Sequence, residues 1–145
     1  MVDRFERFSL AISEISRYWH KIAADEMAKY DLKGPYAIYF TTMYRFPEGI
    51  TAAKLGELCS RDKSDVSRAI SVMEKKGLAI KESNLYRAQL RLSPEGIELA
   101  KHINEKAIAA VEYGGKGLSR EHREIFYNAL ELISSNLQDL SQRGI

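Results

Sequence analysis

The chain of 145 residues lacks several features that would define other classes of protein. A single cysteine, Cys59, excludes an intramolecular disulfide framework and fits a reducing cytoplasm. No apolar run approaches the ~18 residues of a membrane-spanning helix, and the first residues lack the basic and apolar pattern of an export signal. Internal repeats and low-complexity tracts are also absent. We therefore expect a cytoplasmic protein that forms one domain over residues 1–145.

Charge is distributed unevenly along the chain, although its sum is small. Lysine and arginine number 22 against 20 acidic residues, so the formal net charge is +2 and the protein is not a general polyanion binder. Between Lys54 and Arg91, nine lysines and arginines face five acids, a net charge of +4 that leaves −2 for the rest of the chain. A basic segment within a slightly acidic frame favours a localised contact with nucleic acid over ordinary solvated charge.

No catalytic constellation is visible in the sequence. The three histidines, His20, His102 and His122, lie far apart, and none has a Cys, Asp or Glu partner at metal-ligand spacing. No Ser/His/Asp or Cys/His arrangement is present, and the glycine-rich stretch 114–117 follows a predicted helix, whereas a phosphate-binding loop follows a strand. We therefore expect a protein that is not an enzyme and that uses no metal or cofactor.

The segment from Thr51 to Leu92 has the order helix, turn, helix and two-stranded wing. Thr51 is a candidate N-cap for the first helix, and Asp62 is the N-cap expected for the second. Gly77, after two lysines, marks the end of that second helix. The second helix is expected to bury one apolar stripe, formed by Val66, Ala69, Ile70 and Met73.

The opposite face of this second helix carries short hydroxyls and long cations. Side chains of these two kinds reach base edges and phosphates in the DNA major groove. The candidate DNA-binding residues on this face are Lys63, Ser64, Ser67, Arg68 and Ser71. Asp65 lies among them, where a carboxylate opposes phosphate but accepts a hydrogen bond from a cytosine amino group.

The segment LGELCSRDKSDVSRAISVMEKKGLAIKE, followed by RLSPEG, resembles the MarR-type (multiple-antibiotic-resistance regulator) winged helix-turn-helix transcription factors. The likeness lies in the leucine-containing support helix, the S-x-V-S-R recognition helix, the E-K-K-G-L turn into the wing and the L-S-P-E-G start of the next helix. It extends over nearly the whole chain. It implies a mainly α fold with a minor β part, in which long dimerisation helices at 1–32 and 94–145 flank a winged helix-turn-helix lobe at 35–92.

The resemblance also implies a function. The chain is expected to be a homodimeric DNA-binding transcriptional regulator, a repressor of a pseudo-palindromic double-stranded operator that a small aromatic ligand relieves. The family usually carries an aspartate-x-arginine pair at the wing tip. Here the tip, SNLYR, offers only Arg87, which is assigned the wing's minor-groove or phosphate contact.

The two ends of the chain predict helices that pack along other helices. Near the N-terminus, large apolar residues recur at alternating spacings of three and four, the spacing of a helix–helix seam: Phe5, Phe8, Ile12, Ile15, Trp19 and Ile22. A similar stripe lies near the C-terminus, formed by Ile125, Phe126, Ala129, Ile133, Leu137 and Leu140. A domain of this size cannot cover both stripes, so we expect a homodimer.

An aromatic cluster after the first helix has two interpretations. It is either core between the terminal helices and the winged lobe, or a cleft that binds a small aromatic effector, as the resemblance implies. The candidate ligand residues are Tyr36, Tyr39, Phe40 and Arg45. Cys59 similarly suggests a redox sensor, but its place beside Leu58 at the end of the support helix favours a small buried core residue.

A second class of function remains open, a winged-helix module that binds another protein and not DNA. Such modules keep the apolar stripe of the second helix and lose the cations of its outer face and wing. This chain retains Lys63, Arg68, Lys81, Arg87 and Arg91, and these cations favour DNA.

Overall fold

A computed structural model describes residues 2–83 and 87–145. Within these residues the chain is mainly helical, with six α-helices and one small antiparallel sheet of three strands in the order β1-β3-β2. The predicted fold class, a mainly α winged helix-turn-helix protein with long terminal helices, is confirmed. The chain divides into a first unit, Met1–Lys106, and a second unit, Ala107–Ile145.

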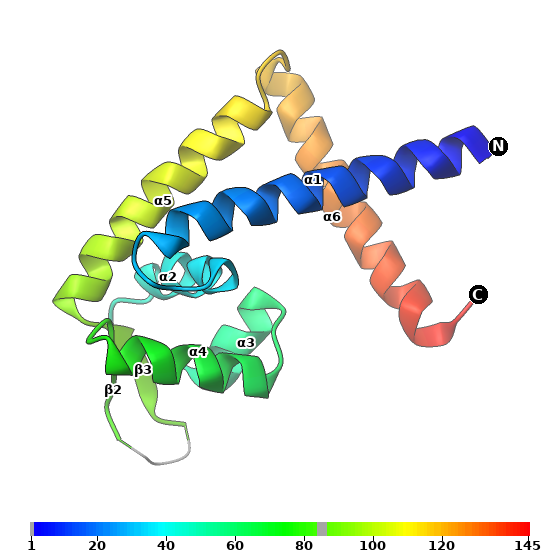
Figure 1. Cartoon of the computed structure of the whole chain (residues 1–145). Helices are drawn as coiled ribbons and strands as arrows, with labels where there is room; N and C mark the ends of the chain where they lie inside the picture. Colours follow the sequence, from blue (N-terminus) through cyan, green and yellow to red (C-terminus); the bar gives the residue numbers. More distant parts are fainter. Residues whose placement is uncertain (1, 84–86) are drawn as a thin grey trace. The chain divides into compact units, whose positions relative to one another are not determined.

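The first unit begins with the long helix α1 (Val2–Ala28), a short 3-10 helix η1 (Gly34–Tyr36) and α2 (Ala37–Tyr44) (Figure 1). Pro35 lies inside η1, and α2 begins two residues later. Gly34 allows η1 to approach α1 closely, since a Cβ there would lie 2.9 Å from the Ala24 backbone nitrogen. The chain therefore folds back onto α1 directly after its end.

The predicted helix, turn, helix and two-stranded wing are present, and they are preceded by a short strand that the sequence did not predict. The segment consists of β1 (Ile50–Thr51), α3 (Ala52–Cys59), α4 (Lys63–Lys75), β2 (Ala79–Lys81) and β3 (Gln89–Leu92). Both predicted N-caps are present: Thr51 Oγ1 accepts from the Lys54 amide at 3.2 Å, and Asp62 Oδ1 accepts from the Asp65 amide at 2.7 Å. Strands β2 and β3 form the wing hairpin next to α4 (Figure 1).

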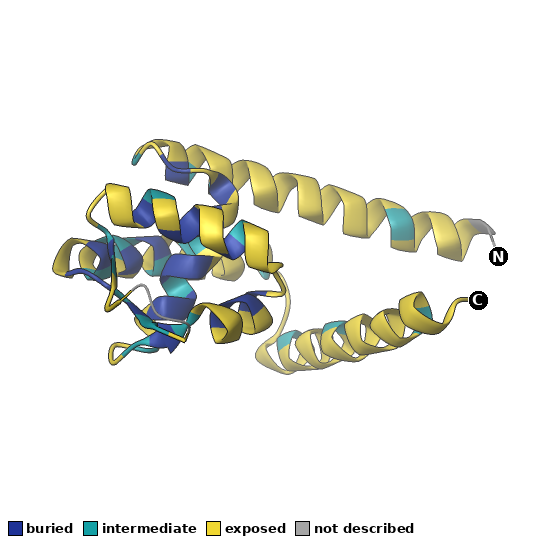
Figure 2. Cartoon of the chain, turned by 90° about the horizontal axis from the view of Figure 1, so that it is seen from below, coloured by how far each residue is buried: buried dark blue, intermediate teal, exposed yellow. Residues whose placement is uncertain are grey.

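The core of the first unit lies among α2, α3, α4, the sheet and the start of α5 (Pro94–Gly114) (Figure 2). The apolar stripe predicted for α4 is buried, with Ala69 and Met73 completely inaccessible. On helix α3, Cys59 faces the core, as expected, while the neighbouring Leu58 is 39% exposed. The buried stripe of α4 fixes which of its side chains point outward.

Ser93 joins the wing to α5. Its hydroxyl caps α5 by accepting from the Gly96 amide at 3.0 Å, and it also donates to the carbonyl of Gly77 at 2.6 Å. Gly77 has the left-handed φ of 72° that ends α4. A Cβ at Gly96 would lie only 1.9 Å from the carbonyl oxygen of Leu78, so only glycine fits this approach. The end of α4 is therefore anchored to α5.

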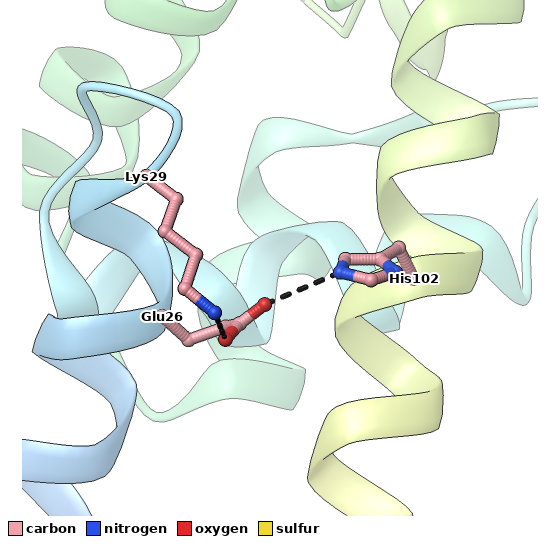
Figure 3. A network of polar contacts seen from close by, with 3 residues as sticks. All are labelled: Glu26, Lys29 and His102. Atoms are coloured by element: carbon pink, nitrogen blue, oxygen red, sulfur yellow. Dashed lines mark hydrogen bonds and ion pairs between the residues drawn. The ribbon is translucent and has the colours of Figure 1, made fainter.

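A polar contact also joins α1 to α5 (Figure 3). Glu26 Oε2 accepts a hydrogen bond from Lys29 Nζ at 2.7 Å, and Glu26 Oε1 lies 3.3 Å from His102 Nε2. The hydrogen bond from Lys29 lowers the pKa of the Glu26 carboxyl. The Tyr30 ring meets the His102 ring edge-on. Together these contacts hold the C-terminal end of α1 against α5.

The second unit contains the end of α5 and the helix α6 (Arg120–Arg143). Residues 115–119 form the turn between the two helices, and Ser119 caps α6 by accepting from the His122 amide at 3.1 Å. Arg123 stabilises the turn by donating to Glu112 at 2.6 Å and to the Gly115 carbonyl at 3.0 Å. No residue of α6 is buried.

Most of each terminal helix is exposed (Figure 2), and the exposed residues include large apolar ones. On α1 they include Phe5, 71% exposed, and Ile15, 60% exposed. On α6, Ile125 is 57% and Leu132 63% exposed. No helix within the described residues is long and apolar enough to cross a membrane. Exposed apolar surface of this extent on a single chain is typical of a protein–protein interface.

Candidate nucleic-acid interface

The outer face of α4 is the candidate interface, because its buried stripe turns the predicted DNA-binding residues toward solvent. All five predicted residues of this helix are exposed: Lys63, Ser64, Ser67, Arg68 and Ser71. The Arg68 side chain is 67% exposed. The structure thus brings these residues together on one accessible helix face.

The N-terminus of α4 adds its own positive potential to this face. Helix N-termini carry partial positive charge and unpaired backbone N–H groups, both of which favour phosphate. Lys63 and Ser64 are the first two residues of the helix, directly after the cap Asp62. The beginning of α4 therefore presents one cation, one hydroxyl and the helix dipole to the same region of solvent.

Asp65 connects this face to the core. Its Oδ2 accepts a hydrogen bond from the hydroxyl of Tyr39, whose side chain is completely buried on α2. Its Oδ1 lies 3.7 Å from Arg68 Nη2. Burial and the hydrogen bond to Asp65 raise the pKa of the Tyr39 hydroxyl well above its usual range, so this hydroxyl is a donor at every physiological pH. Sequence reasoning did not predict this contact, because nothing in the spacing pairs residues 39 and 65.

The wing contributes further cations. Lys81 is exposed at the end of β2, and Arg91 is half-buried on β3. Arg87 is exposed and has a left-handed φ of 66°. The rest of the predicted wing tip, residues 84–86, lies outside the residues that the structure describes. The wing assignment of Arg87 stays a prediction.

The four candidate ligand residues lie in different environments. Tyr39 and Phe40 are fully buried core residues and Tyr36 is nearly so, whereas Arg45 is exposed and stacks over the Phe46 ring at 5.6 Å. An open pocket does lie next to this cluster, between the turn after α1 and the outer face of α4. Its lining includes Tyr36 but not the other three candidates, together with Asp31, Lys33, Ser67, Arg68 and Ser71.

Cys59 is 5% exposed, and its thiol lies 3.4 Å from Thr42 Oγ1. This environment fits the interpretation of Cys59 as a small core residue. Across residues 2–83 and 87–145, no three His, Cys, Asp or Glu side chains are grouped so as to hold a metal ion.

Comparison with known proteins shows which solved structures share this fold. No protein-family model matches the chain, and no curated protein does. Among solved structures, a MarR family transcriptional regulator from Listeria monocytogenes in complex with a 26mer DNA is 25% identical, with a TM-score of 0.81 over 92% of this chain and 93% of that one. A MarR regulator from Methanosarcina mazei is 21% identical, with a TM-score of 0.79 over 93% and 92% of the two chains. A MarR protein from Peptoclostridium difficile is 19% identical, with a TM-score of 0.81 over 91% and 88%.

These structures are similar to this chain over almost their whole length, and all three are described as MarR proteins. The chain therefore has the MarR-type winged helix-turn-helix fold, and the resemblance seen in the sequence is confirmed.

Proposed function

We propose that this chain is a cytoplasmic, homodimeric transcriptional regulator that binds a pseudo-palindromic DNA operator and acts as a repressor. The observation that carries the proposal is the exposed face of α4, where Ser64, Ser67 and Arg68 stand beside the positive end of the helix. The similar Listeria monocytogenes structure contains DNA, which supports this use of the fold. Binding of a protein partner through the same lobe is the alternative, and the exposed cations favour DNA over it.

The dimer is proposed from the apolar surfaces of the terminal helices. The stretches of roughly 5–15 on α1 and 125–140 on α6 are expected to pack against a second copy related by a two-fold axis. Such an interface would be apolar and larger than about 2,000 Å². Two recognition helices related by this axis would read half-sites about one helical turn apart.

Selection from a pool of random DNA duplexes tests the function directly. The purified protein is expected to enrich a pseudo-palindrome with half-sites about one turn apart. Its affinity for the enriched duplex is expected to fall steeply as salt rises from about 50 to 200 mM, because phosphate contacts release counterions. A scrambled duplex of the same composition is the control. Failure to enrich any sequence would contradict the proposal and favour the protein-binding alternative, and so would equal affinity for the enriched and the scrambled duplex.

The pocket beside Tyr36 supports an effector that relieves repression. An aromatic carboxylate would place its ring against Tyr36 and its charge near Lys33 and Arg68, and it would then occupy part of the DNA-binding face. DNA and effector would compete for Arg68. This arrangement uses Tyr36 of the predicted ligand residues, while Tyr39 and Phe40 serve as core.

Salicylate and related benzoates are therefore expected to weaken binding to the enriched duplex by about 5- to 150-fold at saturation. Fluorescence anisotropy of labelled duplex measures this shift. Lys33→Met removes a pocket cation that lies outside the candidate DNA face, so it should reduce the response to ligand and leave affinity without ligand unchanged. If every aromatic acid leaves DNA affinity unchanged at saturation, the pocket does not bind such an effector.

A further inference from the structure

Asp65 is an acidic residue within the recognition helix, among the positions that we assign to DNA, and its two oxygens point to different partners. Oδ2 accepts from Tyr39 of α2, and Oδ1 faces Arg68 one turn further along α4. The Asp65 side chain is 29% exposed, between the buried Tyr39 and the exposed Arg68. The carboxylate thus bridges the core and the DNA-binding face.

The contact with Arg68 would do little if the carboxylate were free to rotate. An exposed pair at i, i+3 with its charges 3.7 Å apart contributes little stability by itself. The Tyr39 hydroxyl changes this, because the ring of Tyr39 is locked in the core and its donor holds one carboxylate oxygen in place. The other oxygen then presents a fixed negative charge to the Arg68 guanidinium.

A carboxylate at this position also has a cost for DNA binding. It lies in the first turn of α4, where phosphate is otherwise favoured, and it repels the DNA backbone. The helix dipole stabilises an acid in the first turn, but it does not explain why one oxygen is held by Tyr39 while the other faces Arg68. This placement is explained if the carboxylate directs Arg68, because a directed guanidinium discriminates between bases better than a freely rotating one.

We propose that Asp65, held by Tyr39, is a positioning residue that fixes the direction of Arg68 and thereby sets base selectivity at one position of each half-site. This inference rests on the proposed DNA-binding function. It predicts that Asp65 lowers affinity for DNA in general and raises the preference for the operator. That preference is the ratio of the affinities for the enriched and scrambled duplexes.

Asp65→Asn isolates the charge. The asparagine carbonyl still accepts from Tyr39, so the link to the core remains, while the attraction for Arg68 is removed. The preference ratio is expected to fall on the order of tenfold, and affinity for the scrambled duplex is expected to rise. Tyr39→Phe keeps the ring and the charge but releases the carboxylate, so the ratio should fall by several-fold without a rise in scrambled-duplex affinity.

Two further variants separate positioning from charge and from structure. Asp62→Asn removes the same charge three residues earlier and keeps a good N-cap, so it should raise affinity for both duplexes alike and leave the ratio unchanged. In an Arg68→Ala background, Asp65→Asn should no longer change the ratio, because the side chain that it directs is absent. Thermal melting of each variant reports any loss of fold independently.

An unchanged ratio in Asp65→Asn would overturn the assignment. An equal fall of the ratio with and without Arg68 would also overturn it, since Asp65 would then act only as a structural link between α4 and α2. If Tyr39→Phe does not fold, the comparison of Asp65→Asn with and without Arg68 decides the question. If the wild-type protein enriches no duplex, the proposed function itself is wrong and the assignment falls with it; an enriched duplex with an unchanged ratio refutes the assignment alone.

Discussion

Ile15→Glu is expected to convert the protein from a stable dimer to a monomer at micromolar concentration. Ile15 lies within the exposed apolar stripe of α1 and is itself 60% exposed in the single chain. In a two-fold interface the substitution places a carboxylate in each copy, and each unpaired charge taken out of water costs several kcal/mol. Since the Ile15 side chain is largely exposed in its own chain, the fold of the first unit should survive.

Sedimentation velocity measures the association state, and circular dichroism confirms that helix content is retained. Ser13→Glu is the matched control, because it adds the same charge to the same helix two residues away, on the opposite face. It should remain a dimer. A monomeric wild-type protein would show that the proposed dimer does not form. A dimeric Ile15→Glu variant would show that the interface lies elsewhere.

Disruption of the dimer should also have a large effect on DNA binding. Each protomer would reach one half-site, and the gain from linking two binding events, about 10²- to 10⁴-fold, would disappear. The Ile15→Glu variant is therefore expected to bind a single half-site duplex as the wild-type protomer does and to bind the full enriched duplex far more weakly than the wild-type dimer. Equal affinity of both proteins for the full duplex would contradict a dimeric mode of binding.

Local signals in the sequence account well for the helix boundaries of the winged segment. Thr51 and Asp62 were predicted as N-caps because a short polar side chain precedes an apolar stripe, and both accept the expected amide hydrogen bond. Gly77 was predicted to end α4, and it has the required left-handed backbone. These features depend on residues within one or two turns, so a single sequence reveals them.

Contacts between distant segments were less accessible to sequence reasoning. The spacing of aromatic residues on α2 does not distinguish a residue that lines a pocket from one that fills the core, and only packing places Tyr39 and Phe40 inside. The hydrogen bond between Tyr39 and Asp65 depends on where the fold places α2 relative to α4, which no local pattern encodes. The outer face of α4 was predictable, by contrast, because it is the complement of a helical apolar stripe.

The double variant Arg68→Ala, Lys63→Ala is expected to bind the enriched duplex much more weakly than the wild-type protein and to lose part of its preference for that duplex over a scrambled one. Arg68 is exposed on the face opposite the buried stripe and is assigned to a base edge, so its removal should cost about 1–3 kcal/mol and relax selectivity at one position per half-site. Lys63 is exposed at the positive end of α4 and is assigned to the backbone. Its removal should weaken all sequences alike and reduce the slope of affinity against salt by about one for each phosphate that is no longer neutralised.

The single variants separate these two roles, since only Arg68→Ala should change the preference ratio and only Lys63→Ala should change the salt slope for both duplexes. Lys75→Ala is the matched control, because it removes a cation from the last turn of the same helix, away from the positive end. It should alter neither the preference ratio nor the salt slope by much.

Arg87→Ala should have the smallest effect among the assigned cations, because the sequence SNLYR departs from the aspartate-x-arginine pattern usual at this wing tip. Wild-type affinity of the double variant for the enriched duplex would show that the outer face of α4 is not the DNA interface, and binding of a protein partner would then become the leading explanation for this lobe.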